Sequence, residues 1–137
     1  MSTFLLKIYT SEKPFFEGEC ESLIVPTSQG LFGIMARHEN VVATLTAGEL
    51  RYRKKDENNF EHVAIAPGIL TVTDNEVVVL TEAAERASDI DFTRAMRQYE
   101  NAKAQLDHAD DAVSRRMAEA KLSRALNRLK VRSGLEK

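Results

Sequence analysis

The residues whose types and spacing suggest chemistry are cations near the end of the sequence. They recur at intervals of three and four positions: Lys121, Arg124, Arg128 and Arg132. A helix would present them as one stripe, along which like charges repel. The stripe therefore predicts an anionic ligand or partner. The alternative is a solvated face whose cations suit the negative end of the helix dipole.

A second group of charged residues lies where short apolar runs give way to helical spacing. Asp89 or Asp91 can cap a helix there, because a carboxylate accepts hydrogen bonds from the free N–H groups of the first turn. Arg94 follows Asp91 at the spacing of a local ion pair. Spacing favours this cap. The alternative is that Glu85, Asp91 and Arg94 gather donors and acceptors for a polar or anionic ligand.

Patterns typical of catalysis are not found in the sequence. It contains neither a G-x-x-x-x-G-K-[ST] phosphate loop nor a G-x-S-x-G nucleophile elbow. His38, His62 and His108 are far apart and lack the spacing of metal ligands, so we expect solvated or hydrogen-bonded side chains. The sequence therefore favours a protein that is not an enzyme and holds no metal.

Cys20 is the only cysteine, so no internal disulfide can form. It lies in a predicted strand, where we expect a small buried hydrophobic side chain. A reducing, cytosolic compartment is the natural expectation. The first residues are not apolar enough for a signal peptide, and no stretch is long enough to span a bilayer. Any membrane association is then expected to be indirect, through partners.

The elements that would position these residues are strands first and helices later. From residue 4 to 81 short β-branched and aromatic runs alternate with turn residues, which predicts a β-sandwich or barrel. The clearest hairpin is expected at Asp74-Asn75, two residues that tolerate the positive φ of a tight turn.

Two amphipathic helices are predicted after residue 91, the first ending near residues 107–111 and the second covering 112–132. A short connection makes them an antiparallel hairpin. The expected apolar stripe of the first helix is Phe92, Ala95, Met96, Tyr99, Ala102 and Leu106. That of the second is Val113, Met117, Ala118, Leu122, Ala125, Leu126 and Leu129.

Net charge separates the same two parts of the chain. Residues 1–87 carry 8 Lys/Arg and 13 Asp/Glu, a balance of −5, whereas residues 88–137 carry 11 and 8, a balance of +3. We therefore expect an N-terminal β-sandwich domain, 1–87, and a C-terminal two-helix hairpin, 88–137, with the basic working surface on the hairpin.

Three stretches carry a family resemblance. Residues 15–51 contain Pro-Thr-x-x-Gly-x-x-Gly-x-x-x-x-His, residues 63–91 read VAIAPGILTVTDNEVVVLTEAAERASDID, and residues 121–131 read KLSRALNRLKV. In this order and spacing the sequence resembles the epsilon subunit of the bacterial F-type ATP synthase over essentially its whole length. One departure is Asn40, where a proline is common in the family.

The resemblance implies a β-sandwich followed by a two-helix hairpin, and a regulatory role without catalysis. A subunit of this kind couples the gamma subunit to the membrane ring of c subunits, at the cytoplasmic face of the bacterial cell membrane. It also restrains ATP hydrolysis. Its hairpin folds down or extends along gamma toward the alpha and beta subunits, where basic residues of the second helix meet acidic segments. The corresponding inhibitory contacts here are Arg115, Arg116 and Lys121.

The resemblance also implies a regulatory ATP site and no required cofactor. Several bacterial members bind ATP through Ile/Leu-Asp-x-x-Arg-Ala, which is matched by Ile90, Asp91, Arg94 and Ala95. An upstream acid is matched by Glu85, and two arginines of the second helix by Arg124 and Arg128. Asn101 departs from the pattern, since strong binders have an arginine there. Loss of a charged hydrogen bond to phosphate lowers affinity by roughly ten- to a hundredfold.

Three other functions fit the sequence less well. A free-standing ATP sensor would share the ATP site but would not bind gamma. A nucleic-acid binder could use the basic helix, but no aromatic residue follows Tyr99 to stack on bases. An enzyme would need a nucleophile and base that the sequence does not bring together. Binding of gamma would decide between the first of these and the stalk subunit.

Overall fold

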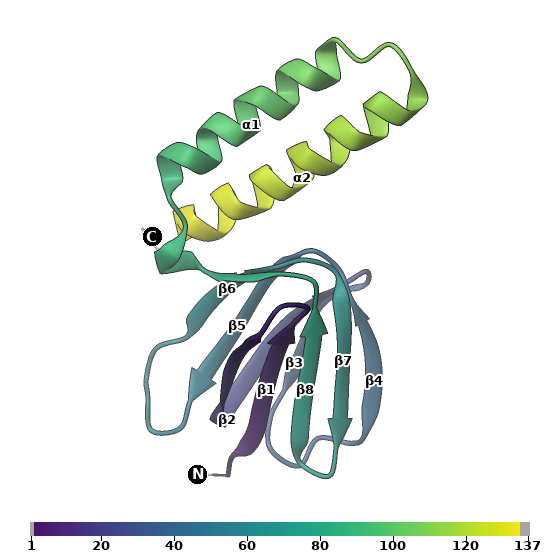
Figure 1. Cartoon of the computed structure of the whole chain (residues 1–137). Helices are drawn as coiled ribbons and strands as arrows, with labels where there is room; N and C mark the ends of the chain where they lie inside the picture. The colour runs from purple at the N-terminus through teal and green to yellow at the C-terminus, as the bar shows by residue number, and fades with distance from the viewer. Residues whose placement is uncertain (1, 135–137) are drawn as a thin grey trace. The chain divides into compact units, whose positions relative to one another are not determined.

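The structure is a computed structural model that describes residues 2–134. The chain forms two compact units, Met1–Arg86 and Ala87–Lys137. The first unit contains nine strands (Figure 1): β1 (Phe4–Thr10), β2 (Pro14–Thr27), β3 (Gly30–Ile34), β4 (Val41–Leu45), β5 (Gly48–Lys54), β6 (Glu61–Ile65), β7 (Gly68–Thr73), β8 (Glu76–Thr81) and β9 (Ala84–Arg86). The predicted β-sandwich is confirmed.

The long strand β2 connects the two layers of the sandwich. Its first half pairs with β1, and its second half pairs with β3 on one side and β5 on the other. The strand order is β4-β7-β8-β1-β2-β5-β6-β9, with β3 beside β2. All pairs are antiparallel except β1 with β8. One strand therefore belongs to both layers, and the sheet bends around the core at β2.

The bend in β2 contains a β-bulge at Glu21. Cys20 pairs with Lys54 and Ser22 with Arg53, so Glu21 is the extra residue. Its carboxylate is buried and accepts a hydrogen bond from Arg53. Burial by itself would raise the pKa of Glu21, but Arg53 and the Asp56 N–H outweigh burial and lower this pKa. The bulge thus places a satisfied ion pair beside the core.

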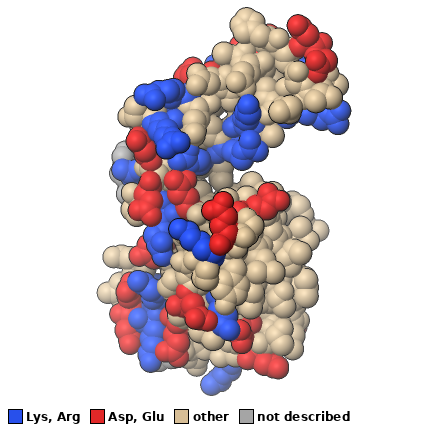
Figure 2. All heavy atoms as spheres, in the orientation of Figure 1, with Lys and Arg blue, Asp and Glu red and all other residues tan. Residues whose placement is uncertain are grey.

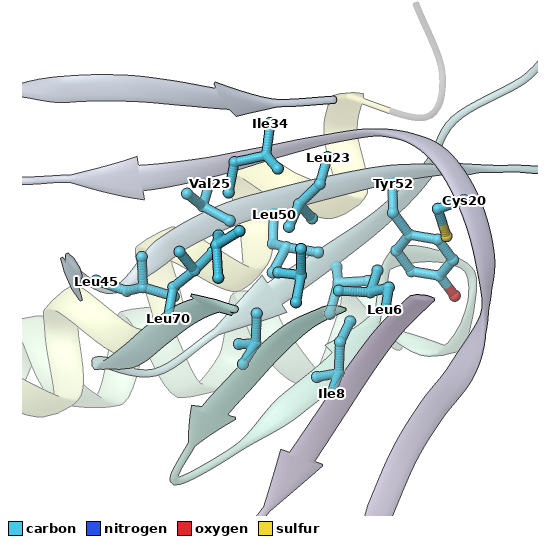
Figure 3. Close-up of a cluster of buried hydrophobic side chains, with 14 of the residues drawn as sticks. Leu6, Ile8, Cys20, Leu23, Val25, Ile34, Leu45, Leu50, Tyr52 and Leu70 are labelled. Carbon is cyan, nitrogen blue, oxygen red and sulfur yellow. The ribbon is translucent and has the colours of Figure 1, made fainter. Parts of the chain in front are cut away.

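Large apolar side chains from both layers fill the sandwich. Leu6, Leu23, Leu50 and Leu70 are fully buried and face one another in Figure 3. Cys20 is buried in β2 as predicted, and burial raises the pKa of its thiol to about 12. Close packing of large residues of this kind provides most of the stability of a small domain.

The hairpin between β7 and β8 is confirmed at the predicted residues. Asp74 and Asn75 have φ angles of 48° and 66°, and Thr73 pairs with Glu76. Two successive positive φ angles are typical of the turn that suits a two-residue hairpin. Asn40 accepts a hydrogen bond from the Asp74 N–H at 3.0 Å. The departure at position 40 therefore has a local structural role.

The second unit is helical. A short 3-10 turn, η1 (Ala87–Asp89), precedes α1 (Phe92–Asp107) and α2 (Ala112–Gly134). The two helices pack side by side and are antiparallel (Figure 1). The predicted two-helix hairpin is confirmed, with a second helix that continues two residues beyond the expected end. No helix in residues 2–134 combines the length and hydropathy needed to cross a bilayer.

The apolar stripes predicted for the helices were only partly right. The buried residues of the two helices are mostly alanines: Ala95, Ala102, Ala118, Ala125, Leu129 and Val131. Phe92, Met96, Val113, Met117 and Leu126 are exposed. Small side chains let two helices approach closely, so the larger residues of each stripe lie outside the contact. We call the four buried alanines the alanine seam.

Candidate functional site

The first helix begins at the cap that the sequence favours. Asp91 has extended backbone geometry and accepts a hydrogen bond from the Arg94 N–H at 3.1 Å. The expected ion pair is wrong, because no salt bridge joins Asp91 to the Arg94 side chain among the described residues. The Arg94 backbone serves the cap, and its exposed guanidinium remains available for another partner.

The two apolar residues of the predicted ATP motif are buried. Ile90 is 3% exposed and Ala95 is fully buried. Ala95 belongs to the alanine seam. A ligand at the surface of the hairpin would therefore meet Asp91 and Arg94, while Ile90 and Ala95 set the packing beneath them.

A groove lies between α1 and α2. Its volume is about 440 Å³. Buried Ala102 and Ala125 from the alanine seam form its floor. The polar residues that line it come from both helices: Gln98, Asn101 and Gln105 from α1, and Lys121, Arg124 and Arg128 from α2. Two of the predicted ATP contacts, Arg124 and Arg128, thus line one groove together with Asn101.

The groove has an unbalanced charge. Three cations line it and no carboxylate does. Arg128 donates a hydrogen bond to the Gln98 side chain across the groove. Lys121 and Arg124 have no hydrogen-bond or ion-pair partner within residues 2–134. Figure 2 shows basic side chains at several places along the hairpin, and acidic side chains both at the end where the helices join and near the opposite end. Such a groove can attract an anion and donate several hydrogen bonds to it.

The predicted motif lies on the same side of α1 as the groove. Arg94 precedes Gln98 by four residues and Asn101 by seven. Residues four and seven positions apart share one face of a helix. The helix thus brings Arg94 into line with the groove, one turn before its nearest lining residue.

The other predicted site residues are more widely placed. Glu85 lies on β9, in the sandwich unit, and its part in a ligand site stays a prediction. Arg115 and Arg116 are exposed in the first turns of α2, while Lys121 lines the groove. The predicted inhibitory contacts therefore do not form a single cluster on the hairpin.

Two groove residues were not identified from the sequence. Gln98 and Gln105 are seven residues apart and fall seven and fourteen positions after Asp91. That spacing would have placed them on the face of the cap. Carboxamides are common on exposed helices, however, and nothing in the sequence distinguishes these two from the rest.

The three histidines behave as expected from their spacing. His38 Nδ1 lies 2.8 Å from the Glu39 carbonyl oxygen, and His62 Nδ1 lies 2.8 Å from a Glu49 carboxylate oxygen. The His108 side chain is exposed. Within residues 2–134, no three His, Cys, Asp or Glu side chains are arranged to hold a metal ion.

Comparison with known families identifies both units. Residues 3–87 match the family described as ATP synthase, Delta/Epsilon chain, beta-sandwich domain, and residues 88–132 match its long alpha-helix domain. The chain belongs to the ATP synthase delta/epsilon family. Curated relatives include the ATP synthase epsilon chains of Ruminococcus albus, 39% identical, and Shouchella clausii, 37% identical. The alignments cover 96% of this chain in both cases, and 97% and 96% of the relatives.

Chains in two solved structures share the fold. A chain from the Euglena gracilis mitochondrial ATP synthase, solved as OSCP, F1 and c-ring, aligns with a TM-score of 0.77 and 21% identity, covering 99% of this chain and 81% of that one. A chain from the central stalk and c-ring of Tetrahymena thermophila mitochondrial ATP synthase aligns with a TM-score of 0.63 and 16% identity. This alignment covers 93% of this chain and 95% of that one. As an epsilon-type member of the family, the chain is a non-catalytic subunit of the ATP synthase complex.

Proposed function

We propose that this chain is the regulatory epsilon subunit of the central stalk of a bacterial F-type ATP synthase. The sandwich binds the gamma subunit and the c-ring, and so helps to couple proton or sodium flow to ATP synthesis. The mobile hairpin inhibits ATP hydrolysis when it extends toward the alpha and beta subunits. ATP binds the folded hairpin and favours that form. The complex lies at the cytoplasmic face of the cell membrane, which this chain reaches only through its partners.

The groove between the helices is the observation that supports ATP binding. It combines three cations with three carboxamides, and it has no carboxylate to repel a phosphate. The exposed guanidinium of Arg94 lies along the same face. An open hairpin would separate Arg124 and Arg128 from α1, so a ligand held by both helices stabilises only the closed pair. A ligand shifts an equilibrium by its difference in affinity for the two states.

Thermal unfolding with ATP tests the site. We expect ATP to raise the melting temperature of the whole chain, by an amount equivalent to about 2.7 kcal/mol at a hundredfold excess over Kd. Arg94→Ala and the double variant Arg124→Ala/Arg128→Ala should each abolish the rise. Arg97→Ala removes the same charge from α1 outside the groove and should retain it. A wild-type melting temperature unaffected by millimolar ATP would reject the ATP site.

Position 101 offers a gain-of-function variant at the same site. Asn101 lines the groove on α1. Asn101→Arg adds a cation that can form a charged hydrogen bond to a phosphate, so we expect affinity for ATP to rise by roughly tenfold. Calorimetric titration of both proteins measures the change. Unchanged affinity would mean that the phosphates lie elsewhere on the hairpin.

An apolar patch on the sandwich supports binding of gamma. Val42 of β4, Ile69 of β7 and Leu80 of β8 are 72%, 49% and 51% exposed. The strand register places Ile69 opposite both Thr44 and Leu80, and Val42 opposite Thr71. Because side chains alternate between faces, these three apolar residues share the outer face of one layer. Clustered exposed apolar residues mark protein interfaces.

Introducing charge into the apolar patch tests the gamma contact. Val42→Lys/Ile69→Lys should weaken co-purification with gamma, because a buried lysine without a partner is costly to desolvate. Lys103→Glu, on the exposed surface of α1, provides a control outside the patch. Loss of gamma binding in the control alone would contradict the assignment. Failure of the wild-type chain to bind gamma would favour the alternative, a free-standing ATP sensor.

The inhibitory role of the basic helix requires a separate experiment. Arg115 and Arg116 are exposed and lie outside the groove. Arg115→Ala/Arg116→Ala should therefore raise ATP hydrolysis by the reconstituted complex and leave the effect of ATP on the melting temperature unchanged. Unaltered hydrolysis would reject the inhibitory role of these two residues and favour the alternative that they belong to a solvated face. Both readouts come from one variant, so inhibition and ligand binding are tested independently.

A further inference from the structure

Lys121 lies in the groove and not only on the exposed stripe to which the sequence assigned it. It lines the groove together with Arg124 and Arg128, and it also lines a second hollow toward the helix junction, beside Asp110 and Asp111. No salt bridge joins it to either aspartate within residues 2–134. The lysine is therefore at the boundary between a cationic groove and an acidic junction, without a partner in either.

The register of the two helices defines what faces Lys121. Gln98 and Arg128 are joined by a hydrogen bond across the groove. In an antiparallel pair, a step of seven residues forward on α1 matches seven back on α2, and each step is a rise of about 10 Å. Gln105 and Lys121 are each seven residues from that pair and line the same groove. The groove is thus bounded by the Gln98–Arg128 hydrogen bond at one end and by Gln105 and Lys121 at the other, with Asn101 and Arg124 between them.

The amides leave hydrogen-bond donors for a ligand. Arginine has no acceptor, so the Gln98 oxygen must face Arg128 and its NH₂ group remains free to donate. Lys121 carries three N–H donors and Arg124 five, and neither is engaged within the described residues. Donors along two helical turns, with no carboxylate among them, match an elongated anion with several acceptor oxygens. A chain of linked phosphates has this chemistry.

We propose that Lys121 is a phosphate-binding residue of this groove and, with Gln105, forms the end of an oligophosphate subsite nearest the helix junction. The inference rests on the proposed ATP site and adds to it a phosphate-binding residue that the predicted motif does not contain. Lys121 then contacts the phosphate chain and not the nucleoside. Occupation by phosphate also withdraws Lys121 from any carboxylate of the alpha and beta subunits.

Titration of the whole chain with ATP and with inorganic tripolyphosphate tests the assignment. We expect Lys121→Gln to lower the affinity for both ligands by about three- to tenfold, which is the effect of losing one hydrogen bond at a partly solvated site. Lys121→Arg keeps the charge and should bind within about twofold of wild type. Lys130→Gln makes the same charge change on α2 outside the groove and should also bind like wild type, which excludes a general effect of net charge.

The remaining outcomes separate the two proposals. If wild type binds ATP and Lys121→Gln binds it equally well, the role of Lys121 is rejected and the ATP site stands. If Lys121→Gln weakens ATP but not tripolyphosphate, the contact is with the nucleoside and the phosphate assignment is rejected. If wild type binds neither probe, the ATP site and this inference fail together. Circular dichroism of each variant confirms that the helices are intact.

Discussion

The sandwich and the hairpin bury different kinds of side chain. The sandwich core contains leucines, valines, isoleucines and Tyr52, drawn from both layers. The helices bury mainly the alanine seam. Burial of apolar area scales with side-chain size, so the hairpin contact is worth much less than the sandwich core. The comparison indicates that separating the two helices would expose less apolar surface than opening the sandwich core.

The largest effect should follow from a cavity in the sandwich. Leu50 is fully buried in β5, and Leu50→Ala should lower the free energy of unfolding by about 2–5 kcal/mol. Leu80→Ala removes the same atoms from a half-exposed position and should cost well under half as much. Urea unfolding of the two variants measures the difference. Equal losses would contradict the view that the core dominates the stability of this unit.

An intermediate effect is expected at the alanine seam. Ala102 is 3% exposed, and Ala102→Leu should force the helices apart at a cost of about 1–3 kcal/mol. Ala104→Leu adds the same atoms on the exposed face of α1 and should change stability by less than about 0.5 kcal/mol. Thermal unfolding followed by circular dichroism compares them. If Ala102→Leu stabilises the hairpin, close approach through small residues is not what holds it.

The smallest effect concerns the start of α2 and depends on pH. Asp111 accepts hydrogen bonds from the Ser114 N–H at 2.7 Å and from the Ser114 hydroxyl at 3.2 Å. The backbone bond is the larger cause that lowers the pKa of Asp111. Its contribution to stability is therefore complete above the unfolded pKa, about 3.9, and is lost as pH falls through the lower folded value.

Asp111→Ala should accordingly lower the helix content near neutral pH. It should also make the loss of helix content in acid smaller than in the wild type. Asp110→Ala removes the neighbouring carboxylate, which forms no hydrogen bond in the described part of the chain. This variant should have the helix content of the wild type near neutral pH and the same loss of helix content in acid. Circular dichroism between about pH 7 and pH 2 follows the transition. A decrease in acid that is identical in wild type and Asp111→Ala would exclude this cap as its source.

Local signals in the sequence were enough to predict the elements of the fold. The turn at Asp74-Asn75 and the cap at Asp91 depend on residues within a few positions of each other. Helical periodicity likewise located both helices. The bulge at Glu21 could not be predicted, because its ion pair with Arg53 depends on the register of two distant strands. Local chemistry was readable, whereas long-range register was not.

The candidate site was predictable to the same degree. The family resemblance supplied Arg124 and Arg128, and the groove contains both. Periodicity predicted too many buried residues in the apolar stripes of the two helices. It cannot distinguish a large side chain that packs between the helices from one that lies exposed beside a contact made by alanines. It also could not pair Gln98 with Arg128, since that contact depends on which turn of α1 meets which turn of α2. Which side chains face each other across the groove could be determined only from the register of the two helices in the structure.

The shared strand β2 has a mechanical consequence for the sandwich. Its backbone is hydrogen-bonded to β1 in one layer and to β3 and β5 in the other. A shear force on one layer is therefore carried to the other through covalent bonds, without reliance on the sliding contact of two apolar faces. The layers cannot slip past each other unless ladder hydrogen bonds of β2 break. The sandwich should therefore respond to an applied force as one stiff body.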